Sequence, residues 1–375
     1  MTTMSIFHYI QRVPVTFGID AIQQLPTLIE QLGGTRGLII CSTSVARSGI
    51  ADKILANNPD KFVGIFTGIK PNPTVANCDD CVHMLREKEC DFVIAIGGGS
   101  VLDCAKFARF IATVEGATAD YLHGTRPITS KGMPLIAIPT TSGSASEVSG
   151  VSVLTDEAAN VKKAIGHPLL YPEIALVDPV LTVSCPANVT AVSGIDVLAH
   201  ALESFYNINH QPFTDLFAEH AARLVFENLR TAYNEPNNLE ARAAMAEASV
   251  AAGQAFNITG TAAAHACSYP LTQIFSVPHG EACAMTLAAF WRLNAVVDPR
   301  LDAFSKRLGF ADANALADEI DNLKRDLGLR LTLADAGITT DEQLQLLIDD
   351  SFAPNIALNP VKMDVDNLRT LYSSL

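Results

Sequence analysis

The chain has 375 residues, enough for two or three domains, and this length excludes a small, motif-sized binding module. Its 40 acidic residues outnumber its 26 basic residues, which gives a formal charge of −14. We therefore expect no nucleic acid and no membrane surface as a partner, because both attract basic protein faces. Hydrophobic residues make up 49 % of the chain, and no apolar run reaches the ~18 residues of a spanning helix, so the sequence predicts a soluble globule with a large core.

The first 18 residues show no basic segment followed by an apolar stretch and a cleavage site, so we expect a cytoplasmic protein without a secretory signal. Eight cysteines are too few and too irregularly spaced for a disulfide framework in a chain of this length. Cys78 and Cys81 form a C-x-x-C pair, but no second pair follows at zinc-site spacing. We interpret them as two thiols one helical turn apart rather than as a metal or redox site.

Short apolar runs alternate with helical patterns in the first half of the chain. Runs of strand length that end near Gly, Ser or Thr occupy residues 36–42, 61–68, 91–99 and 133–141. Helical patterns between them occupy residues 75–90 and 100–114. This alternation is typical of βαβ units and predicts an α/β domain with a mostly parallel sheet, which binds ligands beyond the carboxyl ends of its strands.

The second half, from Pro186 onward, is rich in Ala and Leu at helical spacing and shows no convincing strand. Segments with turn residues interrupt it at 207–213, 234–238 and 276–280. We predict an all-α helical bundle over residues 186–375 and a dinucleotide-binding α/β domain over residues 1–185. For a two-domain enzyme the site is expected between the domains.

Three glycines, Gly97, Gly98 and Gly99, follow the third apolar run and precede a helical pattern that includes Ser100. A glycine turn lets the backbone approach a phosphate, and the free N–H groups of the helix start favour an anion. The segment matches neither the G-x-G-x-x-G motif nor a Walker A loop. A tight strand-to-helix turn that binds no ligand is therefore an alternative interpretation. The negative charge of Asp103 would interact favourably with the helix dipole, or its carboxylate would accept a hydrogen bond from a cofactor amide.

A segment rich in Ser and Thr, residues 139–149, follows the fourth apolar run. Hydroxyl groups at the end of a strand can hydrogen-bond ribose and phosphate oxygens without steric bulk. A solvated serine-rich loop would have the same composition. Because both loops follow strands of the same predicted sheet, we interpret this segment and the glycine turn as opposite walls of a dinucleotide crevice.

Asp196, His200 and Glu203 lie at positions i, i+4 and i+7 of a predicted helix that is otherwise apolar. Buried ionisable groups are rare unless they are paired or bind a metal. His265 and His279 stand among small residues further along the chain. One Asp and three His form an oxygen and nitrogen ligand set that suits Fe²⁺ or Zn²⁺, although ordinary core histidines stay an alternative.

Five separated motifs resemble, in order and spacing, the signatures of the iron-containing (group III) alcohol dehydrogenases. They lie at residues 68–74, 97–106, 139–149, 196–204 and 265–280, and the resemblance runs from about residue 10 to about residue 300. It implies a dehydroquinate-synthase-like fold and a homodimer or larger homo-oligomer. It also implies a metal-dependent alcohol dehydrogenase or aldehyde reductase that transfers hydride between a small alcohol and NAD or NADP.

The resemblance assigns roles to individual residues. The family's metal ligands fall on Asp196, His200, His265 and His279, with Fe²⁺ expected and Zn²⁺ as the alternative, and no cysteine belongs to this set. Its cofactor-binding positions fall on Gly97, Gly98, Gly99, Ser100, Asp103, Thr140, Thr141, Ser144 and Lys162. Glu203 is expected to orient a metal ligand or to form a salt bridge with the neighbouring domain.

Two positions depart from the family pattern. Ser42 lies at or next to the place of an Asp that holds the adenosine ribose and repels a 2′-phosphate, so NADP is not excluded. Tyr269 stands where the family often has a His four residues after the third ligand. A proton relay through that imidazole must then be replaced or rerouted, and the pocket becomes more aromatic.

Three other functions stay open. A maleylacetate-reductase-like enzyme would reduce a double bond without a metal, and the complete ligand set argues against it. A dehydroquinate-synthase-type lyase would reduce and reoxidise NAD within one cycle, and net NADH release would exclude it. A cofactor-binding scaffold without turnover is disfavoured by the complete ligand set.

Overall fold

The computed structural model describes residues 6–375, which divide into two compact units. One unit, the α/β unit, comprises residues 11–141 and 145–183. The other, the helical unit, comprises residues 184–375 together with residues 6–10 and 142–144. The predicted fold classes of both halves are confirmed. Within the part of the chain described, no helix is long and apolar enough to cross a membrane.

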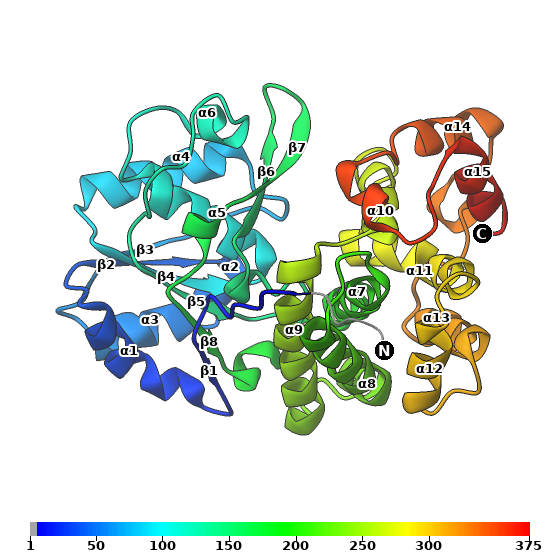
Figure 1. The fold of residues 1–375 in the computed structure, drawn as a ribbon. Coiled ribbons are helices and arrows are strands. Elements are labelled where there is room, and N and C mark those ends of the chain that lie inside the picture. The colour runs from blue at the N-terminus through cyan, green and yellow to red at the C-terminus, as the bar shows by residue number, and fades with distance from the viewer. Residues whose placement is uncertain (1–5) are drawn as a thin grey trace. The chain divides into compact units, whose positions relative to one another are not determined.

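Six parallel strands form the sheet of the α/β unit (Figure 1). They are β1 (Val15–Phe17), β2 (Gly37–Cys41), β3 (Phe62–Phe66), β4 (Phe92–Gly97), β5 (Leu135–Pro139) and β8 (Ile174–Val177). Their spatial order is β1-β8-β5-β4-β2-β3, and every neighbouring pair is parallel. Strands β2, β4, β5 and β8 are buried at every residue, as expected for a parallel sheet that is covered on both faces.

Helices cover both faces of this sheet (Figure 1). They are α1 (Leu25–Leu32), α2 (Thr43–Arg47), α3 (Ile50–Asn57), α4 (Val75–Glu87), α5 (Gly99–Ile111) and α6 (Thr118–Leu122). Neighbouring residues of β4 face opposite cores, because side chains alternate along a strand. Val93 belongs to the core under α4 and α5, and Ile94 belongs to the core under α1 and α3. Each strand and each helix predicted up to residue 141 corresponds to a strand of this sheet or to a helix packed on it.

The sequence analysis missed four strands. Strand β1 is three residues long, too short to show a pattern, and β8 lies in a segment that the analysis treated only as a domain boundary. Strands β6 (Val151–Asp156) and β7 (Val161–Gly166) form a separate antiparallel hairpin. Strand β7 has no fully buried residue, so it lacks the continuous apolar run that identified the central strands.

The helical unit contains only helices among its described residues from 184 onward. They are α7 (Ala187–Tyr206), α8 (Pro212–Asn234), α9 (Leu239–Thr259), α10 (Ala263–Gln273), α11 (His279–Ala295), α12 (Arg300–Arg307), α13 (Ala313–Asp326), α14 (Asp341–Asp349) and α15 (Val365–Ser373). The three predicted breaks separate α7 from α8, α8 from α9 and α10 from α11. One continuous core of Ala, Leu and aromatic side chains connects these helices.

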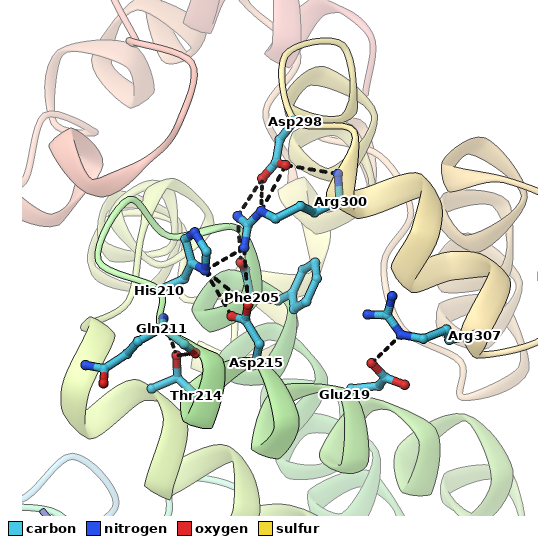
Figure 2. Close-up of polar contacts among 9 residues, drawn as sticks. All are labelled: Phe205, His210, Gln211, Thr214, Asp215, Glu219, Asp298, Arg300 and Arg307. Atoms are coloured by element: carbon cyan, nitrogen blue, oxygen red, sulfur yellow. Dashed lines mark hydrogen bonds and ion pairs between the residues drawn. The ribbon is translucent and has the colours of Figure 1, made fainter. Parts of the chain in front are cut away.

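Arg300 fastens the carboxyl end of α7 to α12, as Figure 2 shows. Its Nη2 donates to the carbonyl oxygen of Phe205 at 3.2 Å, and its guanidinium lies 5.1 Å from the centre of the Phe205 ring. The last carbonyl groups of a helix lack intrahelical donors, so this hydrogen bond caps α7. The same guanidinium also contacts Asp298 at 2.6 Å, His210 at 2.6 Å and Asp215 at 3.4 Å.

We expect Arg300→Met to lower the stability of the helical unit by about 1–3 kcal/mol, because Phe205, Asp215 and Asp298 lose a charged donor. Differential scanning calorimetry of wild type and variant measures the shift. Arg307→Met is the matched control, because Arg307 lies on the same helix but is half exposed and pairs with Glu219 at 2.7 Å. It should cost less than about 1 kcal/mol. Equal shifts would contradict a special role for Arg300.

Candidate metal centre and cofactor loops

Helix α7 carries three buried polar side chains on one face. Asp196 is 6 % exposed, His200 is 6 % exposed and Glu203 is 0 % exposed. Their spacing of four and three residues places them on one stripe of the helix, as predicted. Buried groups of this kind must find partners on the helices packed against α7.

Helices α10 and α11 bring two histidines to this face of α7. His265 is the third residue of α10 and His279 is the first residue of α11. His265 Nε2 lies 3.7 Å from Asp196 Oδ1. The His265 ring centre is 4.6 Å from that of His200 and 5.5 Å from that of His279. The structure therefore brings all four expected metal ligands together within the helical unit.

Gly280 allows α11 to begin beside α7. A Cβ atom at this position would lie 2.1 Å from the carbonyl oxygen of Val192 and 2.8 Å from Asp196 Cβ. Both distances are shorter than any normal contact, so only glycine permits this approach. The approach places His279 next to Asp196.

Three donor atoms at this face have no hydrogen-bond partner among the described residues. They are Asp196 Oδ1, His200 Nδ1 and His265 Nε2. A buried polar atom without a partner costs about 1–3 kcal/mol, so three at one place indicate a missing common partner. A carboxylate oxygen and imidazole nitrogens are donors that Fe²⁺ and Zn²⁺ accept. The residues therefore fit a divalent metal ion.

One residue that the sequence analysis did not expect, Cys283, lies close to three of the expected ligands. The donor atoms of Asp196, His265, His279 and Cys283 all lie within 4.8 Å of one another, whereas His200 is outside this group. The His200 ring stacks on Phe256 at 4.4 Å. Burial, together with the neighbouring imidazoles, holds the pKa of His200 well below its usual value, so its ring is neutral. The sequence analysis missed Cys283, although its position four residues after His279 on one helix was a usable signal.

Glu203 contacts His265 at the side of the ring that faces away from Asp196. Its Oε2 contacts His265 Nδ1, and its Oε1 accepts a hydrogen bond of 3.0 Å from the His265 backbone N–H. Burial alone would raise the pKa of Glu203, but its interaction with His265 brings the pKa below the usual value. In a neutral His265 ring, donation from Nδ1 to the carboxylate leaves the lone pair on Nε2, the atom that lies 3.7 Å from Asp196 Oδ1. The contacts fit the ligand-orienting role expected for Glu203.

Ser268 acts in a similar way on His279. Its Oγ donates to the carbonyl oxygen of His265 at 2.7 Å and lies 3.4 Å from His279 Nδ1. A hydroxyl that donates in one direction can accept in the other. The arrangement favours the His279 tautomer that carries its proton on Nδ1 and a lone pair on Nε2.

Tyr269 lies one turn after His265 on α10 and is half buried. Burial raises the pKa of its phenol, so the hydroxyl is protonated near neutral pH. Its side chain is hydrogen-bonded to Asn355, which also donates to Thr261 Oγ1 and to the Ala262 carbonyl oxygen at 3.1 Å each. The phenol is therefore positioned beside a ligand-bearing turn.

We expect Glu203→Gln to lower metal affinity by about 10–100-fold, because the neutral amide holds the His265 ring less firmly in the tautomer that a ligand needs. Competition with a chromophoric chelator measures the affinity. Glu227→Gln, a change of the same kind on α8 away from the site, is the control and should leave the affinity unchanged. An unchanged affinity in Glu203→Gln would show that the carboxylate does not orient the ligand.

In the α/β unit, the predicted cofactor loops follow three adjacent strands. Ser42 follows β2, Gly97 ends β4, and Thr140 and Thr141 follow β5. The order β5-β4-β2 places these strand ends at one edge of the sheet. This is the edge where parallel sheets bind ligands.

The glycine turn leaves room for an anion at the start of α5. A Cβ at Gly97 would lie 2.6 Å from Val101 Cγ2, and a Cβ at Gly98 would lie 3.2 Å from Thr141 Oγ1. Gly98 is the N-cap of α5 and has no side chain to bond the first N–H groups, which include those of Gly99 and Ser100. These N–H groups fit a phosphate.

Asp103 and Lys106 hold the second loop against α5. Asp103 Oδ1 accepts a hydrogen bond of 2.5 Å from Ser146 Oγ, and Asp103 Oδ2 accepts one of 3.0 Å from the Val153 N–H. Lys106, which is fully buried, pairs with Asp103 at 3.1 Å and donates to backbone oxygens of Ser146 and Ser149. Asp103 thus makes loop contacts that the sequence analysis did not foresee, and Lys106 was missed entirely.

Three further expected cofactor residues lie apart from this loop contact. Lys162 is on β7, where its Nζ donates to Asn72 Oδ1 at 2.8 Å. Ser144 falls in the short 142–144 segment that groups with the helical unit. Ser42 caps α2 by accepting a hydrogen bond of 3.2 Å from the Val45 N–H, and it carries no charge.

Glu147 is a buried carboxyl group in the second loop. It is 2 % exposed, and burial raises its pKa from 4.5 to about 7, although the Lys106 ammonium opposes the rise. The folded protein therefore binds a proton at Glu147 that the unfolded chain releases between pH ~4.5 and ~7. Stability falls as pH rises through this window.

We expect Glu147→Gln to remove about 3 kcal/mol of this pH dependence, which is the free energy that corresponds to the rise of the Glu147 pKa from 4.5 to about 7. The variant should gain stability over wild type at pH 8 and gain little at pH 5. Thermal unfolding at both pH values measures the difference. Glu157→Gln, on the exposed turn of the β6–β7 hairpin, should leave it unchanged. An identical pH profile for wild type and Glu147→Gln would refute this role.

Comparison with known proteins shows one family over most of the described chain. Residues 13–179 match the iron-containing alcohol dehydrogenase family, and residues 190–375 match the C-terminal region of the Fe-containing alcohol dehydrogenase family. The similarity thus extends beyond residue 300, where the motifs alone had ended. It confirms the resemblance that the motifs predicted.

Individual relatives are similar over nearly their full length. Long-chain-alcohol dehydrogenase 1 of Geobacillus thermodenitrificans is 34 % identical, over 95 % of this chain and 93 % of the relative. The 1,3-propanediol dehydrogenase of Citrobacter freundii is 34 % identical, over 86 % of each chain. The crystal structure of sulfoacetaldehyde reductase from Bifidobacterium kashiwanohense in complex with NAD⁺ superposes with a TM-score of 0.96 at 40 % identity, over 99 % of each chain.

Proposed function

The chain belongs to the iron-containing alcohol dehydrogenase family and is an NAD-dependent alcohol dehydrogenase or aldehyde reductase, and we propose that Asp196, His200, His265 and His279 hold its catalytic metal ion. The observation that carries the proposal is that Asp196 Oδ1, His200 Nδ1 and His265 Nε2 are buried without a hydrogen-bond partner among the described residues. Fe²⁺ is the ion that the family name implies, and Zn²⁺ accepts the same donors.

In alcohol oxidation a hydride leaves the carbinol carbon and a proton leaves the hydroxyl oxygen. Bound NAD⁺ would accept the hydride, and the proton would pass to solvent. A bound divalent ion supplies Lewis-acid polarisation of the substrate oxygen. Glu203 keeps the His265 ring in the ligand tautomer. Tyr269, which is protonated near neutral pH, donates a hydrogen bond where other members of the family would use an imidazole.

The cofactor is bound by the glycine turn and the loops at the same edge of the sheet. The N–H groups of Gly99 and Ser100 receive the pyrophosphate, and Thr140 and Thr141 contribute hydroxyl groups, with Ser144 and Lys162 as further cofactor contacts. Ser42 offers no carboxylate to repel a 2′-phosphate, so this position does not exclude NADP(H). The NAD⁺ complex of the Bifidobacterium relative supports NAD(H) as the cofactor of this chain.

The substrate class is a small alcohol or aldehyde, since relatives are named for 1,3-propanediol, methanol and sulfoacetaldehyde. The proposed assembly is a homodimer or larger homo-oligomer, and the proposed location is the cytoplasm. The family resemblance supports the assembly, and the eight free cysteines are consistent with a reducing compartment.

A panel of alcohols and aldehydes with NAD(H) and NADP(H), assayed on protein loaded with Fe²⁺ or Zn²⁺, tests this function. We expect His279→Ala to lose bound metal and turnover together, whereas His220→Ala, at an exposed position on α8, should retain both. Net NADH release would exclude a lyase that recycles NAD. Full turnover by metal-free protein would overturn the metal assignment and favour a maleylacetate-reductase-like reaction.

A further inference from the structure

The tip of the second loop, residues 142–144, groups with the helical unit and is bonded to α9 there. The backbone N–H of Gly143 donates to Ser249 Oγ, on α9, at 3.0 Å. This hydrogen bond is buried, and Ser249 is only 2 % exposed. A buried backbone N–H is unfavourable unless it is paired, so the Ser249 hydroxyl fixes where the tip lies.

Gly143 also packs closely against α7. A Cβ atom at this position would lie 2.7 Å from Ser193 Cβ and 3.1 Å from Ser193 Cα. The first distance is shorter than any normal contact, so a larger residue would push the tip away from the helix. Ser193 precedes Asp196 by nearly one helical turn. The tip is therefore held against the helix that carries Asp196 and His200, two of the expected metal ligands.

The loop is held again directly after its tip. Ala145 is 1 % exposed and adopts a left-handed backbone conformation with a φ of 48°. This conformation is unfavourable for a residue with a Cβ atom and persists only where the surrounding structure fixes the backbone. Ser146, the next residue, donates to Asp103 Oδ1 at 2.5 Å. Ser144 is thus an exposed residue between two attachment points of the loop.

We propose that Ser249 is a positioning residue for the dinucleotide cofactor and acts through the loop tip that carries Ser144. The inference rests on the proposed function, in which Ser144 contacts NAD(H). A loop that already holds its bound conformation loses less entropy when a ligand binds. Without the Ser249 hydroxyl the tip adopts other conformations as well, and the apparent affinity falls with the fraction of protein that is competent to bind.

Fluorescence titration of the full-length, metal-loaded protein with NADH tests the role of Ser249. We expect Ser249→Ala to bind NADH about 2–10-fold more weakly than wild type, the factor that one neutral hydrogen bond contributes to an equilibrium constant. Ser305→Ala is the matched control, because Ser305 is similarly buried in α12 but donates within its own helix, to the Leu301 carbonyl oxygen at 2.8 Å. It should bind NADH like wild type.

Steady-state kinetics distinguish positioning from a purely structural role. In Ser249→Ala we expect KM for NAD⁺ to rise by the same factor, whereas kcat at saturating NAD⁺ and the metal content stay close to those of wild type. A purely structural role would reduce the amount of active protein and so lower kcat without changing KM for NAD⁺. That pattern would overturn the inference.

Gly143→Ala is a second variant that displaces the same tip. Its Cβ atom would collide with Ser193, so we expect NADH to bind more than about tenfold more weakly. Unchanged NADH affinity in Ser249→Ala would overturn the inference and leave the proposed function intact, because wild type would still bind the cofactor. If Ser249→Ala does not fold, the affinity of Gly143→Ala decides in the same way. A wild type that does not bind NADH would overturn both.

Discussion

The burial of an acid and an imidazole on one face of α7 is the constraint on which the helical unit depends. Asp196 and His200 are removed from water without a hydrogen-bond partner for Asp196 Oδ1 or His200 Nδ1 among the described residues. Their desolvation is unfavourable unless another group converges on them. Helices α10 and α11 meet that requirement by bringing His265 and His279 to the same point. The way in which α7, α10 and α11 pack therefore depends on one buried polar cluster.

The cofactor loops of the α/β unit depend on a different buried charge. Lys106 is wholly enclosed and bonds to backbone oxygens of the loop that follows β5. Asp103 pairs with it and holds Ser146 and Val153. This internal ion pair ties the loop directly to the helix that begins at the glycine turn. The two predicted walls of the cofactor site are therefore connected by these contacts.

Sequence patterns predicted what is local and repeated. The central strands were found because fully buried strands are continuous apolar runs, and the stripe on α7 was found because helical spacing is regular. Strand β1 was missed because three residues carry no period. Lys106 was missed because a lysine in a helical pattern is ordinarily on the surface, and only the path of the loop buries it.

Cys283 illustrates the same limit at the site. Its residue type and its spacing from His279 were visible in the sequence, but its convergence with Asp196 and His265 depends on how three helices cross. Such crossing is determined by close contacts such as that of Gly280 with Val192, which no local pattern shows.

All the proposed metal donors lie in the helical unit, so the ion acts as a thermodynamic ligand of that unit alone. A ligand that binds only the folded state adds about 1.4 kcal/mol of stability for each tenfold excess of its concentration over Kd. The α/β unit holds none of these donors and is instead sensitive to proton activity through Glu147. The availability of metal and the acidity of the medium therefore act on the stability of the chain through residues in different units.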